Sequence, residues 1–365
     1  MYVFSSVTQS TRSRQLWLKT AALGVALAAL GWTFRDVQGE RVVAALARLG
    51  VLGVGVALLP QAAGIALDTL GWRTTFATLG ARAQFRPLLW TRLATEALAL
   101  VIPGGAVVAE PLKVPLLGRH AKLESSAAIA GIVARKYLVL AAQSGWLAVA
   151  TVLALTVSWR AHAGGESLLR IVVAVALASL SLGVTALGLR LLLSRGTLAI
   201  RVKGWLSRVP SAALHEKLLR SDAVFRQTDG KLARFFAERK AREAGLTLLF
   251  GCAWATEALE TYLFLRLLGV ELDFGVVAMM EVALTLLRNL TFLIPAGIGV
   301  QDLGYALFLR AFGVSEATEL AAAFTLLKRG KELLLVALGL GLLSTDHAFA
   351  RSAGQPGAAR APAIL

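Results

Sequence analysis

Ionisable residues lie inside long apolar stretches of this sequence. Two basic pairs stand out, Arg135 and Lys136 in the first half and Lys328 and Arg329 in the second. A charge in an apolar membrane segment is costly unless it is paired or hydrated, so such residues mark substrate or ion pathways. Arg135 and Lys136 could instead extend their charged ends to the membrane surface. Lys328 and Arg329 lie near the centre of their segment, which favours a functional role.

Acidic residues occupy the same apolar segments. They can neutralise neighbouring Arg and Lys side chains, which is the favoured interpretation, or carry protons that couple movement to a gradient. Glu110 and Asp302 are the best candidates for substrate contact, because each follows a proline by seven residues, about two helical turns. The other acidic residues of this kind are Asp68, Glu96, Glu257, Glu260 and Glu281.

Two helix-breaking motifs interrupt apolar runs. The first is Pro103-Gly104-Gly105, and the second, which starts 192 residues later, is Pro295-Ala296-Gly297-Ile298-Gly299. The helix after each break begins with free N–H groups and a partial positive charge, which attract anions such as phosphate. Breaks at matching points in two halves of a membrane protein are the best sequence indication of a transport site. The predicted substrate-binding residues are Pro103, Gly104, Gly105, Glu110, Lys113, Arg135, Lys136, Arg288, Pro295, Gly297, Gly299, Asp302, Lys328 and Arg329.

The composition indicates a polytopic membrane protein. Hydrophobic residues make up 57% of the 365 positions, and the mean hydropathy is +0.68. The formal net charge of +16 comes from basic residues that lie mostly between apolar runs, which favours anionic lipid headgroups over nucleic acid as partners. The single cysteine, Cys252, excludes an intramolecular disulfide and a thiolate metal cluster. With no HExxH, P-loop or nucleophile-elbow motif, we expect no enzyme activity, cofactor or metal.

We predict an all-α fold with an inverted-topology repeat of six full transmembrane helices and two re-entrant hairpins. The full crossings are expected at about 16–34, 51–79, 125–159, 168–193, 244–268 and 320–343, and the hairpins at 87–118 and 274–312. Charge counts indicate that the first hairpin enters from the cytoplasm and the second from outside. Such a repeat can expose a central site to each side in turn.

The predicted organisation places both termini in the cytoplasm, at a bacterial inner membrane. Its parts are a cytoplasmic N-terminus 1–15, a first membrane repeat 16–160, a turn and helix 161–193, a basic cytoplasmic segment 194–242, the rest of the second repeat 243–345 and a disordered tail 346–365. Between 195 and 242, apolar residues with helical spacing face away from basic ones. We expect this segment to lie on the anionic inner leaflet, with a soluble connector as the alternative.

These motifs resemble the flippase-like transmembrane family, which includes the membrane part of lysylphosphatidylglycerol synthases (multiple peptide resistance factor) and stand-alone relatives such as hopanoid-cluster members. The resemblance covers about residues 15–345. Its markers are Pro103-Gly104-Gly105 with Glu110, Lys113 and Arg135, then Pro295 to Gly299 with Asp302. The family usually has a more Gly-rich first motif, and often Glu and Arg where this chain has Asp302 and Lys113. The soluble aminoacyl-transfer domain of bifunctional members is absent, so lysyl transfer is not expected.

The resemblance implies that the protein moves a lipid with an anionic or zwitterionic headgroup between leaflets. The predicted function is a lipid translocator whose hairpin tips and basic pairs hold a lipid phosphate near the midplane. Two alternatives stay open: a non-catalytic subunit that presents a polyprenyl or hopanoid lipid to a separate biosynthetic enzyme, and a lipid-modifying enzyme. Phospholipid, polyprenyl phosphate and hopanoid are not distinguished, because each requires an apolar groove and one headgroup site.

Overall fold

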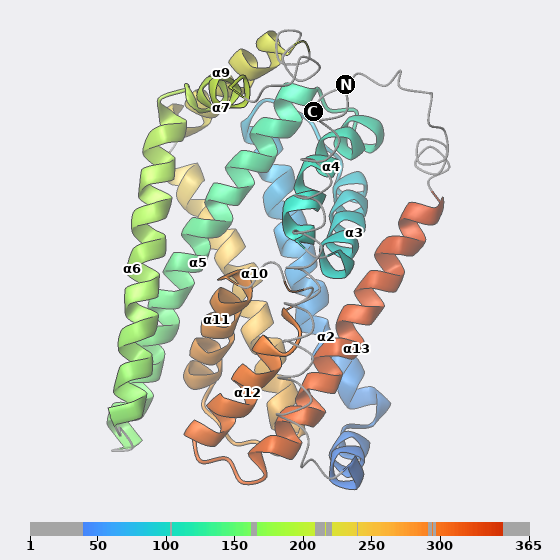
Figure 1. Cartoon of the computed structure of the whole chain (residues 1–365), viewed down its shortest axis with the longest axis vertical. Coiled ribbons are helices and arrows are strands. Elements are labelled where there is room, and N and C mark those ends of the chain that lie inside the picture. The colour runs from blue at the N-terminus through green and yellow to red at the C-terminus, as the bar shows by residue number, and fades with distance from the viewer. Residues whose placement is uncertain are drawn as a thin grey trace, which may run out of the picture.

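The computed structural model consists of helices joined by short connections, with no strand among the residues it describes (Figure 1). Those residues are 39–102, 104–161, 166–208, 216, 221–238, 240–290, 294 and 297–345. The expected first crossing, the N-terminal segment and the tail from 346 onward lie outside them. The all-α prediction is therefore confirmed over the described part of the chain.

The helices follow the apolar runs of the sequence. They are α2 (Gly39–Thr78), α3 (Phe85–Val101), α4 (Gly105–His120), α5 (Ser125–Ala161), α6 (Glu166–Ser194), α7 (Leu198–Leu206), α9 (Asp222–Glu238), α10 (Lys240–Leu267), α11 (Phe274–Leu290), α12 (Val300–Ala311) and α13 (Ala317–Thr345). Gly50, with a φ of 59°, kinks α2. We call α3 and α4 the first helical pair and α11 and α12 the second helical pair. In Figure 1 the first pair lies in the upper half of the molecule and the second in the lower half.

Three described helices are long and apolar enough to cross a membrane. The segments are Gly53–Thr78 of α2, Ser125–Leu153 of α5 and Val173–Ser194 of α6. They coincide with three of the expected crossings. The helices α10 and α13 cover the last two expected crossings, but they are not among these three, and both contain buried ionisable residues such as Glu260 and Lys328. The polytopic membrane prediction is thus supported, although hydropathy alone identifies only part of the helical bundle.

Each helical pair packs against a long helix from the other half of the chain. The first pair lies along α13 through α3, and the second lies along α5 through α11, while α2 and α10 contact each other extensively. Glycines permit the α2 and α10 contact: a Cβ added at Gly64 would lie 2.3 Å from Thr256 Oγ1, and one at Gly71 would lie 2.8 Å from the Phe250 ring. Small residues let membrane helices approach closely and gain van der Waals contact, which replaces the hydrophobic driving force that lipid removes.

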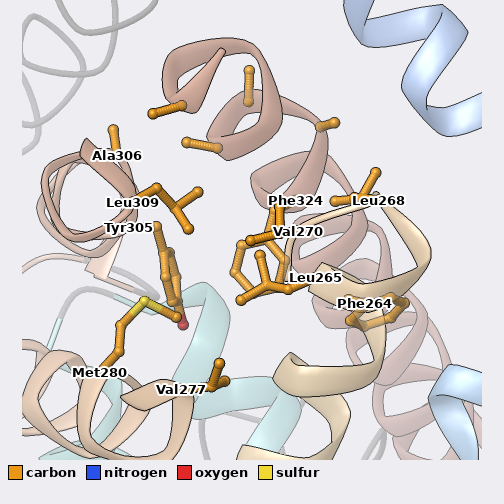
Figure 2. Close-up of a cluster of buried hydrophobic side chains, with 14 of the residues drawn as sticks. Phe264, Leu265, Leu268, Val270, Val277, Met280, Tyr305, Ala306, Leu309 and Phe324 are labelled. Atoms are coloured by element: carbon orange, nitrogen blue, oxygen red, sulfur yellow. The ribbon is translucent and has the colours of Figure 1, made fainter. Parts of the chain in front are cut away.

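The largest apolar cluster holds the second helical pair on α10 and α13. Figure 2 shows Tyr305 and Leu309 of α12 beside Phe324 of α13 and Leu265 of α10. The rings of Tyr305 and Phe324 meet edge to face, with centroids 4.7 Å apart. This geometry suits the ring quadrupoles and contributes about 0.5–1.5 kcal/mol beyond the buried area. The cluster therefore fixes the orientation of α12 relative to the long helices.

The basic segment forms separate helices. Its buried acid, Asp229 of α9, caps the start of α7: the N–H groups of Ala199 and Ile200 donate to the two carboxylate oxygens at 2.8 and 3.0 Å. A carboxylate at a helix N-terminus satisfies orphan donors and complements the helix dipole. One of the few acids in this basic stretch thus has a structural role.

The apolar stripe of the basic segment is covered by protein on α9. Its residues Leu232, Phe235 and Phe236 are buried in a cluster with residues of α5, α6 and α10. These three side chains therefore contact protein and not lipid, because an apolar stripe can pack on apolar helices as well as on a membrane. The expectation that the segment lies on the inner leaflet stays a prediction. Exposed apolar side chains of the segment lie on α7 instead, including Ile200 and Trp205.

Gly339 of α13 provides a test of the packing between α13 and the first helical pair. An added Cβ would lie 2.4 Å from the Leu93 carbonyl oxygen and 2.5 Å from Ala97 Cβ, so Gly339→Leu must separate the helices. We expect a loss of about 1–3 kcal/mol, typical of overpacking, measured as a lower temperature at which the purified protein loses its monodisperse size-exclusion peak. Gly341→Leu is the matched control, because nothing lies within 4 Å of its added Cβ. Equal effects of the two substitutions would contradict the close approach.

Candidate functional site

A cavity of about 210 Å³ lies between α2, α3, α5, α10 and α13. Much of its lining is ionisable, in a region where apolar side chains would be the default. The ionisable lining residues are Asp68, Arg92, Glu96 and Arg135 from the first half and Glu257, Lys331 and Glu332 from the second. Three formal positive charges therefore face four negative ones. The cavity is polar and close to electrically balanced.

Asp68 organises the first-half side of the cavity. The Nη2 atom of Arg135 donates to both oxygens of Asp68 at 2.8 Å, and Arg92 Nε lies 3.1 Å from Asp68 Oδ2. Arg92 also lies 3.5 Å from Glu96 Oε2 and donates through Nη1 to the Ile65 carbonyl at 2.7 Å. Two guanidinium groups thus share one buried carboxylate, and the more exposed Glu96 offsets the remaining positive charge.

Aromatic rings hold the guanidinium of Arg135. Its Cζ lies 5.5 Å from the centroid of the buried Trp72 ring and 6.0 Å from that of Phe250. Cation–π contacts of this kind gain strength when the charge is removed from water. The Nε–H of Arg135 has no hydrogen-bond acceptor within the described part of the chain. Arg135 is therefore fixed in position, with its Nε–H buried.

The second-half side is formed by three neighbouring charges. Lys331 Nζ lies 2.7 Å from Glu260 and 3.4 Å from Gln61 Oε1, and Glu332 accepts from Arg329 Nη1 at 2.6 Å. Glu257 lines the cavity, is partly exposed and forms no ion pair among the described residues. Among the described residues, no Lys or Arg side chain forms an ion pair with this carboxylate of the lining.

Equivalent ion pairs occur in the two halves. Lys136 Nζ lies 2.6 Å from Glu110, and Arg329 Nη2 donates to both oxygens of Asp302 at 2.8 Å. The two acids are 192 residues apart and the two bases 193. In both halves the second base of the pair binds the acid seven residues after the break. The sequence identified all four residues without identifying the pairing.

Glycines in left-handed conformation begin the helices after both breaks. Gly104 has a φ of 69° at the start of α4, and Gly299 has a φ of 83° at the start of α12. At α12 the Gly299 N–H donates to Asp302 Oδ2 at 2.9 Å. That donor was expected to be free for a substrate phosphate, but the chain's own carboxylate already occupies it. Arg329 in turn neutralises Asp302.

The residues predicted from the sequence fall into several groups. Asp68, Glu96 and Arg135 line the cavity, while Glu260 and Arg329 bind the lining residues Lys331 and Glu332. Glu110 binds Lys113 at 2.8 Å in addition to Lys136. The residues in the turns and at the helix starts after the two breaks are not among the lining residues of this cavity; they are Gly104, Gly105, Gly297, Gly299 and Asp302. Pro103, Pro295 and the side chain of Arg288 lie outside the described residues.

Lys328 and Glu281 form a buried pair apart from the cavity lining. Their side chains are 8% and 2% exposed, and Nζ lies 3.0 Å from Oε1. The hydroxyl groups of Thr261 and Tyr305 donate to Glu281 Oε2 at 2.7 and 2.9 Å. Both carboxylate oxygens are therefore satisfied, and a structural role in joining α10, α11, α12 and α13 accounts for the pair.

Sequence reasoning missed Arg92 altogether and did not place Glu257, Lys331 or Glu332 in the site. Arg92 lies in an apolar segment four residues before Glu96. Its position inside that segment is the signal that would have found it. The comparison of the two halves does not indicate it, because Leu284 lies 192 residues after Arg92 and carries no charge.

Most of the chain matches the model of a known protein family. The family model described as the lysylphosphatidylglycerol synthase TM region matches residues 19–339. The match includes every residue that lines the polar cavity. A search of curated proteins finds no match for this chain. The family match, together with the apolar spans, places the protein in a membrane.

Removal of one member of the Lys328 and Glu281 pair should be strongly destabilising. Lys328→Met leaves a buried carboxylate without its cation, and we expect a loss of about 3–5 kcal/mol. The double variant Lys328→Met/Glu281→Gln removes both charges and should recover most of that loss. Thermal unfolding of the purified proteins, followed by intrinsic fluorescence, measures both effects. A double variant no more stable than Lys328→Met would contradict the structural role.

Proposed function

Because the chain belongs to the lysylphosphatidylglycerol synthase transmembrane-region family, we propose that it is a lipid translocator that moves lipid headgroups between leaflets. The observation that carries the proposal is the polar cavity lined by ionisable side chains from both halves. Family membership supports a role in lipid handling, and translocation is the step that we add. Charged residues are retained inside a membrane where a polar group must pass or bind. We further propose that the chain moves the lipid without altering it covalently.

The charge balance of the cavity favours a zwitterionic headgroup. A purely anionic headgroup would add charge to a lining that already carries one more acid than base. A phosphate oxygen can accept from the guanidinium of Arg135, which lines the cavity, and an amine can bind the carboxylate of Glu257, which forms no ion pair among the described residues. Both contacts would be charge-assisted hydrogen bonds, the strongest kind available in a polar site. This refines the sequence-based expectation of a phosphate site at the two turns.

The acyl chains are proposed to remain in the bilayer while the headgroup passes. The cavity volume of about 210 Å³ accommodates a headgroup and not two acyl chains. Keeping the tails in hydrocarbon avoids a transfer cost of about 0.8 kcal/mol per CH₂. The protein must therefore lower the barrier for the polar group alone.

The proposed movement is a rocking of two units related by an inverted repeat, with the helical pairs as re-entrant hairpins. The Lys136 and Glu110 pair ties α4 to α5, and the Arg329 and Asp302 pair ties α12 to α13. In contrast, α3 packs on α13 and α11 packs on α5, contacts that join the two halves. The ion pairs thus join helices within each unit. Sliding would occur where the two units pack together, between α3 and α13 and between α11 and α5.

A liposome assay tests the proposal. The purified protein should accelerate leaflet exchange of phosphatidylethanolamine labelled on an acyl chain, which leaves the amine free, as measured by dithionite quenching. Glu257→Gln should slow this exchange about tenfold or more, because a hydrogen bond to a charged group contributes about 1.5–3 kcal/mol. Glu271→Gln is the control, since this carboxylate is highly exposed and does not line the cavity. Phosphatidylglycerol labelled in the same way should be less affected by Glu257→Gln.

Absence of exchange above the protein-free rate for every lipid tested would overturn translocation. Copurification of a lipid-synthesising enzyme in that case would support the role of a lipid-presenting subunit instead. If Glu257→Gln and Glu271→Gln slowed the exchange equally, the lipid would not pass through the polar cavity.

A further inference from the structure

A second and larger cavity lies on the opposite side of the wall formed by α5 and α10. Its volume is about 860 Å³, and its lining comes from α5, α6 and α10. The body of this groove is apolar, with Gly145 and Val149 from α5, Leu187 from α6, and Leu248 and Gly251 from α10. It shares no lining residue with the polar cavity.

The groove is open space, unlike the close contact between α2 and α10. A Cβ added at Gly145 or Gly251 would have no atom within 4 Å. Val149, Leu187 and Leu248 are exposed apolar side chains at its edges. Because these helices lie in hydrocarbon, the groove faces lipid along its length and has the surface chemistry of an acyl-chain site.

Polar residues gather at one end of the groove, where α10 begins. Tyr137 Oη donates to Glu243 at 2.5 Å, and Arg190 donates to both Glu243 oxygens at 2.8 and 3.0 Å. Lys240 also lines this end, is exposed and forms no ion pair among the residues described. Two bases and one acid leave the polar end with one formal positive charge.

The polar end must supply the selectivity of the groove. Acyl chains gain little by leaving the bilayer for an apolar groove, since lipid tails are as apolar as the side chains that would replace them. The positive end, together with the partial charge of the α10 N-terminus, favours a negatively charged headgroup. The neighbouring basic segment adds to this, because the residues from 195 to 242 include 12 Lys and Arg against 4 acids.

We infer that this groove binds an anionic phospholipid, with an acyl chain along Gly145 and Gly251 and the phosphodiester at Lys240 and Arg190. The occupant differs from the translocated lipid in charge and lies on the other face of α5 and α10. It is a resident or regulatory lipid that contacts the wall of the polar cavity. The inference does not depend on translocation.

Photo-crosslinking of the full chain in nanodiscs tests this site. The probe is phosphatidylglycerol with a diazirine in its acyl chain, at trace level in phosphatidylcholine, and mass spectrometry maps the adducts. We expect adducts on residues 248–255 that unlabelled phosphatidylglycerol competes away and added phosphatidylcholine does not. Lys240→Gln should reduce the yield about fivefold, the effect of one lysine near an anionic lipid surface. Arg242→Gln, which removes the same charge two residues away and outside the lining, should not.

A filling substitution gives an independent test. Gly145→Leu should abolish the adducts by occupying the groove, whereas Gly188→Leu on α6 should not, since Gly188 has equally open surroundings but does not line the groove. Size-exclusion profiles confirm that both variants fold. Equal labelling by phosphatidylcholine and phosphatidylglycerol probes, or equal loss in Lys240→Gln and Arg242→Gln, would overturn the site. Glu257→Gln should leave labelling unchanged, so failure here is distinguishable from failure of translocation.

Discussion

Hydrocarbon offers no partner to a charged or hydrogen-bonding group, and the arrangement of this protein depends on that constraint. Its buried charges find their partners on other helices. Asp68 of α2 binds Arg135 of α5, and Lys328 of α13 binds Glu281 of α11. Breaking one partner from such a pair is far more costly than losing a surface salt bridge. The ion pairs therefore act as cross-links that determine which helices lie side by side, while glycines determine how closely they approach.

The same constraint explains why α5 and α10 can separate two different environments. Along α10, Trp254 and Glu257 face the polar cavity, whereas Gly251 and Ala255 face the apolar groove. A helix of 3.6 residues per turn presents these positions on different sides. Charges on the first side are sheltered from lipid by the surrounding helices. The second side requires such shelter only at the start of α10, where Lys240 and Glu243 lie, because its remaining groove-lining residues carry no charge.

Apolar periodicity and the repeated breaks predicted the helices, because both depend on local sequence. The partners of the charges depend on three-dimensional arrangement and were harder to foresee. An acid near the start of a helix can point away, so that the N-terminal N–H groups stay available to a ligand, or it can accept a hydrogen bond from them. The sequence is the same in both cases, and only the structure shows that Asp302 accepts from the Gly299 N–H. Likewise, the stripe on α9 has the same pattern whether lipid or protein covers Phe235. Arg92 was missed because it has no matching base in the other half.

Each basic pair also connects the polar cavity to one of the helical pairs. In the first half, Arg135 lines the cavity while the adjacent Lys136 binds Glu110 of α4. In the second, Arg329 binds both Asp302 of α12 and Glu332 of the lining. A headgroup that competes for Glu332 would weaken the contact between Glu332 and Arg329, and so change the charge balance around the Arg329 and Asp302 pair. Occupancy of the cavity would thereby alter the contacts at the start of α12, which is the coupling that an alternating mechanism requires.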